Sequence, residues 1–209
     1  MENIKIKGFF KENFVLIIIL LLGFIIRLYY LIITKNQATW WDESEYISVG
    51  LHWFFDIPYD LNPQRPPLLP LLEGILLKLG GTEFLLKMIL ELIPSTLLIL
   101  VSYFIVKEMY NKKLALIVAL FTSIFWLIIF NTVRLHADVL LLFFGYLAML
   151  FFWKGYVKKE KNYYLWLIGV FIALAFLTKL TAVLFIFVIL AFLLIKDKLK
   201  FLKNKHLWV

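Results

Sequence analysis

Long apolar runs separated by short polar segments dominate the chain. They predict membrane-spanning helices, because about 20 apolar residues suffice to cross about 30 Å of hydrocarbon. The first run is interrupted only by Arg27, and the last contains a single charge, Lys179. One helix over residues 163–195 would be about 50 Å long, so we divide this run at Lys179. The predicted spans are 14–34, 84–106, 114–133, 139–153, 163–178 and 180–195.

The segment between the first two spans, residues 35–83, is predicted to carry two interfacial helices. The apolar stretch 66–79 reaches only about 21 Å as a helix, too short to cross a membrane. It also holds Glu73 and Lys78. A further helix is expected over 43–55, where the acids at positions 42 and 45 have capping-box spacing.

Lysine clusters indicate how the chain is oriented. Basic residues mark cytoplasmic loops, and six spans place every lysine cluster on the same face. Counting 66–79 as another span would break this arrangement. We therefore expect a multi-pass protein of the cell membrane, with a cytoplasmic N-terminus and an external loop 35–83. The clusters fall in 1–13, 107–113, 154–161 and 196–205.

Composition supports the same class of protein. Hydrophobic residues make up 63% of the chain, charged residues 17%, and the mean hydropathy is +0.91. Although the net charge is +8, segments buried in lipid cannot present a basic face to nucleic acid. The absence of cysteine excludes disulfides and thiolate metal ligands. The predicted fold is an all-α polytopic membrane protein made of one transmembrane module.

The densest polar cluster follows the first span and contains the adjacent acids Asp42 and Glu43. Neighbouring side chains on a helix point in different directions, so one acid could act as a base while the other orients a ligand. The alternative is structural, an interfacial tryptophan belt with helix capping.

Other charged residues lie at the predicted external ends of the spans, and each has an ordinary alternative role. Arg65 could be a snorkelling side chain, and Asp138 could be the N-cap of the fourth span. Lys179 alone would be a turn lysine. Arg27 could snorkel or pair with an acid such as Glu91. The remaining candidates are Arg134, a further cation, and His136, an interfacial histidine or a metal ligand.

Together these residues suit one kind of reaction. A carboxylate can take the proton of an attacking hydroxyl. Arginine and lysine can hold the charge that develops on a leaving phosphate. The sequence therefore favours a reaction at the external face in which a phosphate is the leaving group and a hydroxyl is the nucleophile.

At these positions the sequence resembles membrane glycosyltransferases of the C superfamily (GT-C). The closest resemblance is to protein O-mannosyltransferases and to aminoarabinose transferases that modify lipid A. The matching motifs occur in order along nearly the whole chain. They are Arg27, Asp42-Glu43-x-x-Tyr46, Arg65-Pro66-Pro67-Leu68, Gly80-Gly81, the turn 107–113, Arg134-x-x-x-Asp138 and Ala175-Phe176-Leu177-Thr178-Lys179.

The resemblance implies a GT-C-like bundle and specific residue roles. Asp42 is the implied catalytic base with Glu43 beside it, and Asp138 is a second acidic site. Arg65, Lys179 and Arg134 are the implied carrier-phosphate ligands. The implied donor is a polyprenyl- or dolichyl-phosphate sugar, the acceptor is a protein or glycolipid hydroxyl, and the displacement is inverting. A divalent cation, Mg or Mn, would use Asp42, Asp138 and His136.

Two other functions remain open from the sequence. A transporter or flippase of lipid-linked sugars would place charges deep in discontinuous helices. A non-catalytic subunit is the other alternative, because family members usually carry more spans and often a soluble C-terminal domain. We therefore expect this sequence to lack C-terminal parts of the family.

Overall fold

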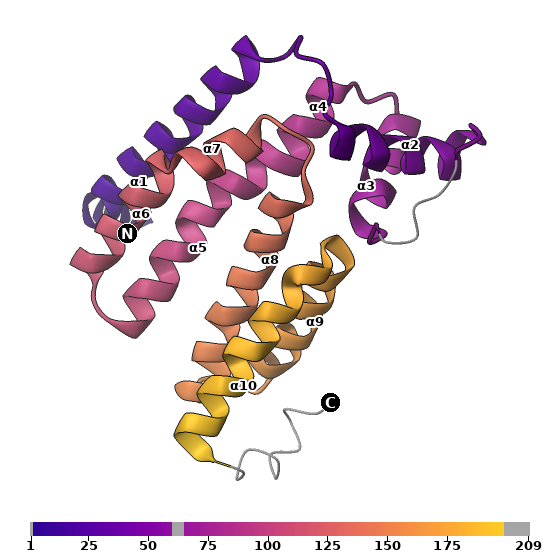
Figure 1. Ribbon diagram of the computed structural model, residues 1–209. Coiled ribbons are helices and arrows are strands. Elements are labelled where there is room, and N and C mark those ends of the chain that lie inside the picture. The colour runs from indigo at the N-terminus through magenta and orange to yellow at the C-terminus, as the bar shows by residue number, and fades with distance from the viewer. Residues whose placement is uncertain (1, 60–64, 199–209) are drawn as a thin grey trace.

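The computed structural model describes residues 2–59 and 65–198. These residues form helices and turns, and the described ranges contain no strand (Figure 1). The elements are α1 (Glu2–Ile33), α2 (Trp41–Phe55), α3 (Leu68–Lys78), α4 (Glu83–Lys87), η1 (Met88–Leu92), α5 (Ile93–Met109), α6 (Lys112–Ile124), α7 (Trp126–Thr132), α8 (Ala137–Phe152), η2 (Trp153–Val157), α9 (Tyr163–Thr178), η3 (Leu180–Ala182) and α10 (Val183–Asp197).

The predicted all-α polytopic membrane fold is confirmed. In the described ranges four helices are long and apolar enough to cross a membrane: Glu12–Ile33, Glu83–Met109, Ala137–Val157 and Leu180–Asp197. The bent pair α6 and α7 makes a fifth if it counts as one span, and α9 is a shorter apolar helix. The count of six spans therefore stays a prediction.

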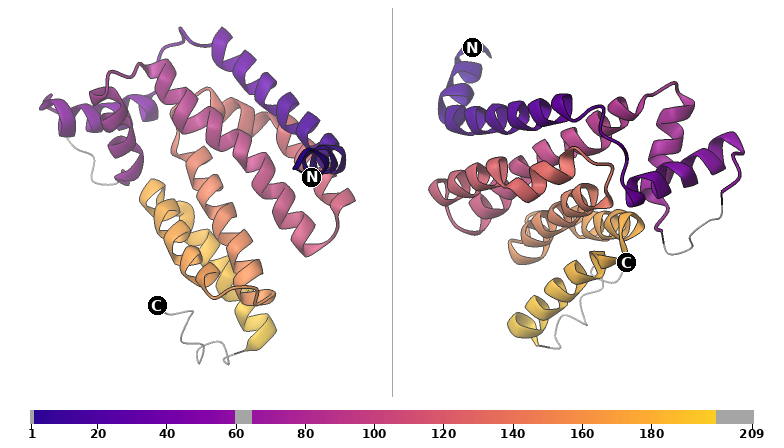
Figure 2. Two further views of the ribbon diagram at one scale, coloured as in Figure 1. Left: turned by 180° about the vertical axis from the view of Figure 1, so that it is seen from behind. Right: turned by 45° about the horizontal axis from the view of Figure 1, so that its top comes forward.

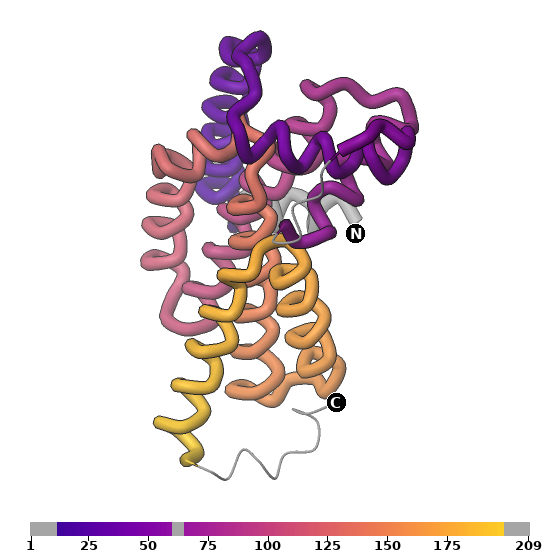
Figure 3. The backbone as a smooth tube through the Cα atoms, turned by 45° about the vertical axis from the view of Figure 1, so that its right-hand side comes forward, coloured from indigo at the N-terminus to yellow at the C-terminus, as the bar shows by residue number. Residues whose placement is uncertain are grey.

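The two ends of the helix bundle differ (Figures 1, 2 and 3). At one end α2, α3 and α4 lie beside the α7–α8 connection and the turn between α9 and η3. At the other end are the α5–α6 turn and the end of α10. The segment predicted to be external therefore gathers at one end of the bundle, together with the turns that carry the candidate charges.

Two glycines let α2 and α3 pack closely. A Cβ on Gly50 would lie 2.8 Å from the Pro70 carbonyl oxygen, and one on Gly74 would lie 2.3 Å from the Phe54 ring. A buried apolar cluster then fixes this pair on the bundle. The cluster contains Tyr46, Leu69, Leu86, Leu90, Leu135, Ala137 and Leu140, so it joins α2 and α3 to α4, η1 and α8.

The expected helix caps are wrong in detail. The Trp40 backbone N–H donates to Glu43 at 2.5 Å, so Glu43 rather than the Asp42 and Glu45 pair caps α2. Asp138 is not the N-cap of its helix either, because α8 begins at Ala137 and Asp138 lies in its first turn. Asp42, Glu45 and Asp138 are therefore all available for other contacts.

Candidate functional site

Arg65 joins two acids of α2. Asp42 and Glu45 are three residues apart and lie on the same side of the helix. The Arg65 guanidinium lies 2.5 Å from Asp42 Oδ1 and is also bonded to Glu45 Oε2. The Asp42 side chain is 53% exposed, whereas those of Arg65 and Glu45 are largely buried. Asp42 is thus an accessible carboxylate whose orientation is set by a neighbouring cation.

The Arg65 guanidinium lies over the aromatic ring of Tyr46. This ring is buried in the cluster that docks α2, and the guanidinium carbon lies 5.1 Å from the ring centre. Arg65 also donates a hydrogen bond to the Tyr46 hydroxyl. Burial raises the pKa of Tyr46, while the hydrogen bond and positive charge of Arg65 oppose the rise. Arg65 is therefore held by two acids and an aromatic ring.

Glu43 points into the protein, away from Asp42. It is fully buried, and its carboxylate accepts from the Leu135 backbone N–H at 2.9 Å and from Arg134 at 3.3 Å. Lys87 Nζ lies 3.9 Å from Glu43 Oε1. The two adjacent acids thus occupy different environments, and Glu43 ties α2 to the segment that precedes α8.

Arg134 contacts the buried Glu43, and we call this pair the buried anchor. Besides Glu43, it donates to the Gln37 side chain at 3.0 Å and to the Ala38 carbonyl at 3.2 Å. Its guanidinium lies 4.2 Å from the centre of the Trp40 ring. These contacts hold the chain between α1 and α2, and they leave Arg134 buried rather than open to a ligand.

Asp138 and Lys179 form a second ion pair on other elements. Lys179 Nζ lies 2.7 and 2.9 Å from the two Asp138 oxygens. The lysine follows α9 in an extended conformation, and the acid is in the first turn of α8. Both side chains are partly exposed, at 40% and 36%. This pair therefore presents one acid and one cation to the surroundings, as Asp42 and Arg65 do.

The two ion pairs face the same region. His136 is half-buried, and burial lowers its pKa, while the charges of Glu43, Asp138 and Asp42 raise it and that of Lys179 lowers it further. Both ion pairs are thus near enough for their charges to act on His136, whose Nδ1 lies 3.2 Å from the Asn131 side-chain oxygen. No three His, Asp or Glu side chains in the described ranges are arranged to hold a metal ion. Asp42 and Asp138 instead face cations, so we assign no step to Mg or Mn.

Two further acids are buried beside this region. Glu73 in α3 and Glu91 in η1 are fully buried, and within the described chain their carboxyl oxygens have no hydrogen-bond partner. Burial raises the pKa of Glu73, and the negative charge of Glu43 raises it further. Both effects favour the neutral form of the Glu73 carboxyl group.

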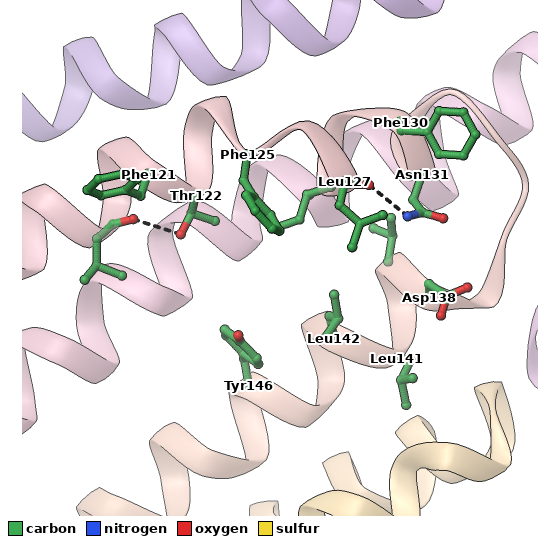
Figure 4. A pocket seen from close by; sticks show the side chains of 13 residues that line it. Phe121, Thr122, Phe125, Leu127, Phe130, Asn131, Asp138, Leu141, Leu142 and Tyr146 are labelled. Carbon is green, nitrogen blue, oxygen red and sulfur yellow. Dashed lines mark hydrogen bonds between the residues drawn. The ribbon is translucent and has the colours of Figure 1, made fainter.

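An apolar groove leads to Asp138. It has a volume of about 820 Å³ and lies between the bent pair α6–α7 and α8 (Figure 4). Figure 4 shows aromatic and leucine side chains along its length, with Asn131 and Asp138 near one end. The lining residues include Phe121, Thr122, Phe125, Leu127, Leu142 and Tyr146.

The structure brings together Asp42 with Arg65, and Asp138 with Lys179, while Glu43 and Arg134 lie in a separate buried anchor. Sequence reasoning missed Glu45 and Tyr46 as partners of Arg65. Their signal was their position one turn beyond Asp42 on the same helix. It also missed the groove, because its lining residues look like ordinary lipid-facing side chains.

The chain matches the model of a known protein family. The model of the dolichyl-phosphate-mannose-protein mannosyltransferase family matches residues 64–209, which is most of the chain. The chain belongs to this family. The GT-C resemblance is thereby confirmed, and the protein is a membrane glycosyltransferase of the mannosyltransferase type. Arg65, Asp138 and Lys179 lie inside the matched segment, whereas Asp42 and Glu43 precede it. No curated protein and no solved structure matches the chain.

Proposed function

We propose that this mannosyltransferase-family protein transfers a sugar from a polyprenyl- or dolichyl-phosphate carrier to an acceptor hydroxyl at the external membrane face. One observation carries the proposal: an apolar groove between membrane helices ends at Asp138, which is paired with Lys179. An isoprenoid chain suits such a groove, and a phosphate at its end would lie near the lysine.

Asp42 is the proposed base. The acceptor oxygen attacks the anomeric carbon of the sugar, and the bond between that carbon and the phosphate oxygen breaks. The hydroxyl proton passes to Asp42, and the electron pair of the broken bond stays on the carrier phosphate. Attack from the side opposite the phosphate inverts the anomeric carbon. The exposed carboxylate of Asp42 is open to an acceptor in a way that the buried Glu43 is not.

Arg65 and Lys179 are the proposed phosphate ligands. Both are cations on connections between helices at the same end of the bundle. In this structure Arg65 is paired with two acids and Lys179 with one. Charge-assisted hydrogen bonds from such groups stabilise the negative charge that develops on a leaving phosphate. Glu43 and Arg134 are proposed to position α2 rather than to contact the substrate.

The test uses the protein in reconstituted membranes with a panel of polyprenyl- and dolichyl-phosphate sugars and hydroxyl acceptors. Mass spectrometry measures carrier phosphate and glycosylated acceptor. The proposal expects both products in equal amounts, and a loss of about 100-fold in Arg65→Met. Transbilayer movement of the donor without sugar transfer would instead establish a flippase and overturn the proposal.

A further inference from the structure

Arg27 is buried in the membrane part of the bundle, where an arginine needs a specific reason to be present. It is 0% exposed, and its guanidinium donates only to carbonyl oxygens among the described residues. The acceptors are Gly23 at 3.0 Å, Ser123 at 2.8 Å and Thr122 at 3.0 Å. Arg27 therefore neither snorkels nor pairs with Glu91, in contrast to both expectations from the sequence.

The acceptors on α6 are carbonyls that a break in the helix leaves without partners. α6 ends at Ile124, Phe125 is extended with φ −68° and ψ 111°, and α7 begins at Trp126 with its axis bent by 50°. In an unbroken helix the carbonyls of residues 122 and 123 would accept from the N–H groups of residues 126 and 127. Unpaired carbonyls are unfavourable in a membrane, so Arg27 replaces the missing donors.

The local sequence offers one weak cause for the break, because the Thr122 and Ser123 hydroxyls donate to helix carbonyls and such bonds can bend a helix. Residues 112–132 contain no proline and no glycine, the usual causes of a sharp kink. Insertion of a side chain into the helix hydrogen-bond ladder is another known cause. Gly23 makes this insertion feasible, because a Cβ there would lie 2.4 Å from Ile99 Cδ1 and 3.1 Å from Ser123 Cβ. The close approach of α1 thus places the Arg27 guanidinium at the break between α6 and α7.

The break also shapes the apolar groove. The groove is lined by residues before the bend, such as Phe121, by Phe125 at the bend, and by residues after it, such as Leu127 (Figure 4). We infer that Arg27 is a positioning residue that holds α6 and α7 bent, and that this bend opens the groove to the isoprenoid chain of a lipid phosphate. The identity of that lipid rests on the proposed function.

The bend can be measured directly because the chain contains no cysteine. Spin labels on Leu97→Cys in α5 and Asn131→Cys in α7 report the position of α7 by pulsed electron resonance. A straight helix would displace the end of α7 by roughly 7 Å at 1.5 Å per residue. We expect a shift of this order in Arg27→Met and none in Ile25→Met, which replaces a lipid-facing residue of α1.

A proline can restore the α6–α7 bend in Arg27→Met without the arginine. Trp126→Pro places proline at the first position of α7, where its missing N–H costs little, and the extended Phe125 suits a residue that precedes proline. Trp126 itself does not line the groove. Arg27→Met combined with Trp126→Pro should therefore restore the bend.

Binding of a polyprenyl phosphate by native mass spectrometry completes the test. We expect at least 10-fold weaker binding by Arg27→Met and recovery in the double variant. If Arg27→Met does not accumulate, recovery of folded protein by the proline is the supporting result and failure to recover overturns the inference. An unchanged label distance, or normal binding by Arg27→Met, also overturns it. Absence of binding by the unmodified protein would overturn the proposed function instead, while the label distances still decide the role of Arg27 in the bend.

Discussion

Lys179 donates to both oxygens of Asp138 at 2.7 and 2.9 Å, although Asp138 lies in α8 and Lys179 follows α9. The pair sits where the apolar groove ends. Because both side chains are partly exposed, their attraction contributes at most about 1 kcal/mol to stability. The placement of this pair therefore matters more for binding than for folding.

Replacing Lys179 by methionine should separate these two effects. We expect Lys179→Met to weaken binding of a polyprenyl phosphate about 10-fold, since one phosphate ligand is lost. The midpoint of thermal unfolding should change little. Lys161→Met, which removes a lysine from the α8–α9 connection, is the matched control and should leave binding unchanged. Equal binding by both variants would show that Lys179 is not a ligand of the carrier phosphate.

Replacing Glu43 should affect folding strongly. Glu43→Gln leaves Arg134 buried without its carboxylate, whereas Lys87 keeps its ion pair with Glu83. Removal of one partner of a buried ion pair costs about 3 kcal/mol or more. Chemical denaturation in detergent micelles measures the free energy of unfolding. Glu160→Gln, which disrupts a partly exposed pair with Lys154, should cost under about 1 kcal/mol. A Glu43→Gln protein as stable as that control would contradict the anchor described here.

Glu73 should make stability depend on pH. Burial raises its pKa in the folded protein well above the usual value of 4.5. As pH rises above about 4.5, the unfolded chain loses this proton while the folded protein keeps it, so stability falls as pH rises toward the folded pKa. Glu73→Gln cannot titrate, and its unfolding midpoint should therefore decline less between about pH 5 and about pH 8. Equal slopes in the two proteins would show that Glu73 is ionised when folded.

The hydroxyl of Tyr46 should affect the donor KM by positioning Arg65. Tyr46→Phe removes the hydrogen bond to Arg65 and keeps the ring beneath it, so we expect the donor KM to rise about 3-fold to 10-fold with little change in kcat. Tyr46→Leu also removes the ring and should have a larger effect. Tyr110→Phe, at the opposite end of the bundle, is the control. A fall in kcat at constant KM would contradict a positioning role.

The sequence predicted the helical membrane fold because apolar run lengths reflect the thickness of the bilayer. It also anticipated that Asp42 and Glu43 would differ, since adjacent side chains on a helix point in different directions. It could not show that Glu43 caps α2 and reaches Leu135, because that contact depends on how distant segments pack.

The helix break at Phe125 could not be predicted from the sequence either. The residues around it include no proline or glycine, and the interacting group is Arg27, far away in the chain. From the sequence Arg27 could snorkel or pair with an acid, and nothing indicated that its partners would be backbone carbonyls. The groove that follows from this bend therefore could not be predicted from apolar pattern alone.

The most direct test of the account is sugar transfer by Asp42→Asn. This variant keeps the shape of the side chain and removes the base, whereas Asp56→Asn removes an acid at the opposite end of α2 as a matched control. Mass spectrometry of acceptor and carrier phosphate measures transfer, and polyprenyl phosphate binding verifies that the site is intact. The account predicts a loss of transfer of at least about 100-fold in Asp42→Asn with binding retained, and normal transfer in Asp56→Asn. Normal transfer by Asp42→Asn would contradict the assignment of Asp42 as the catalytic base.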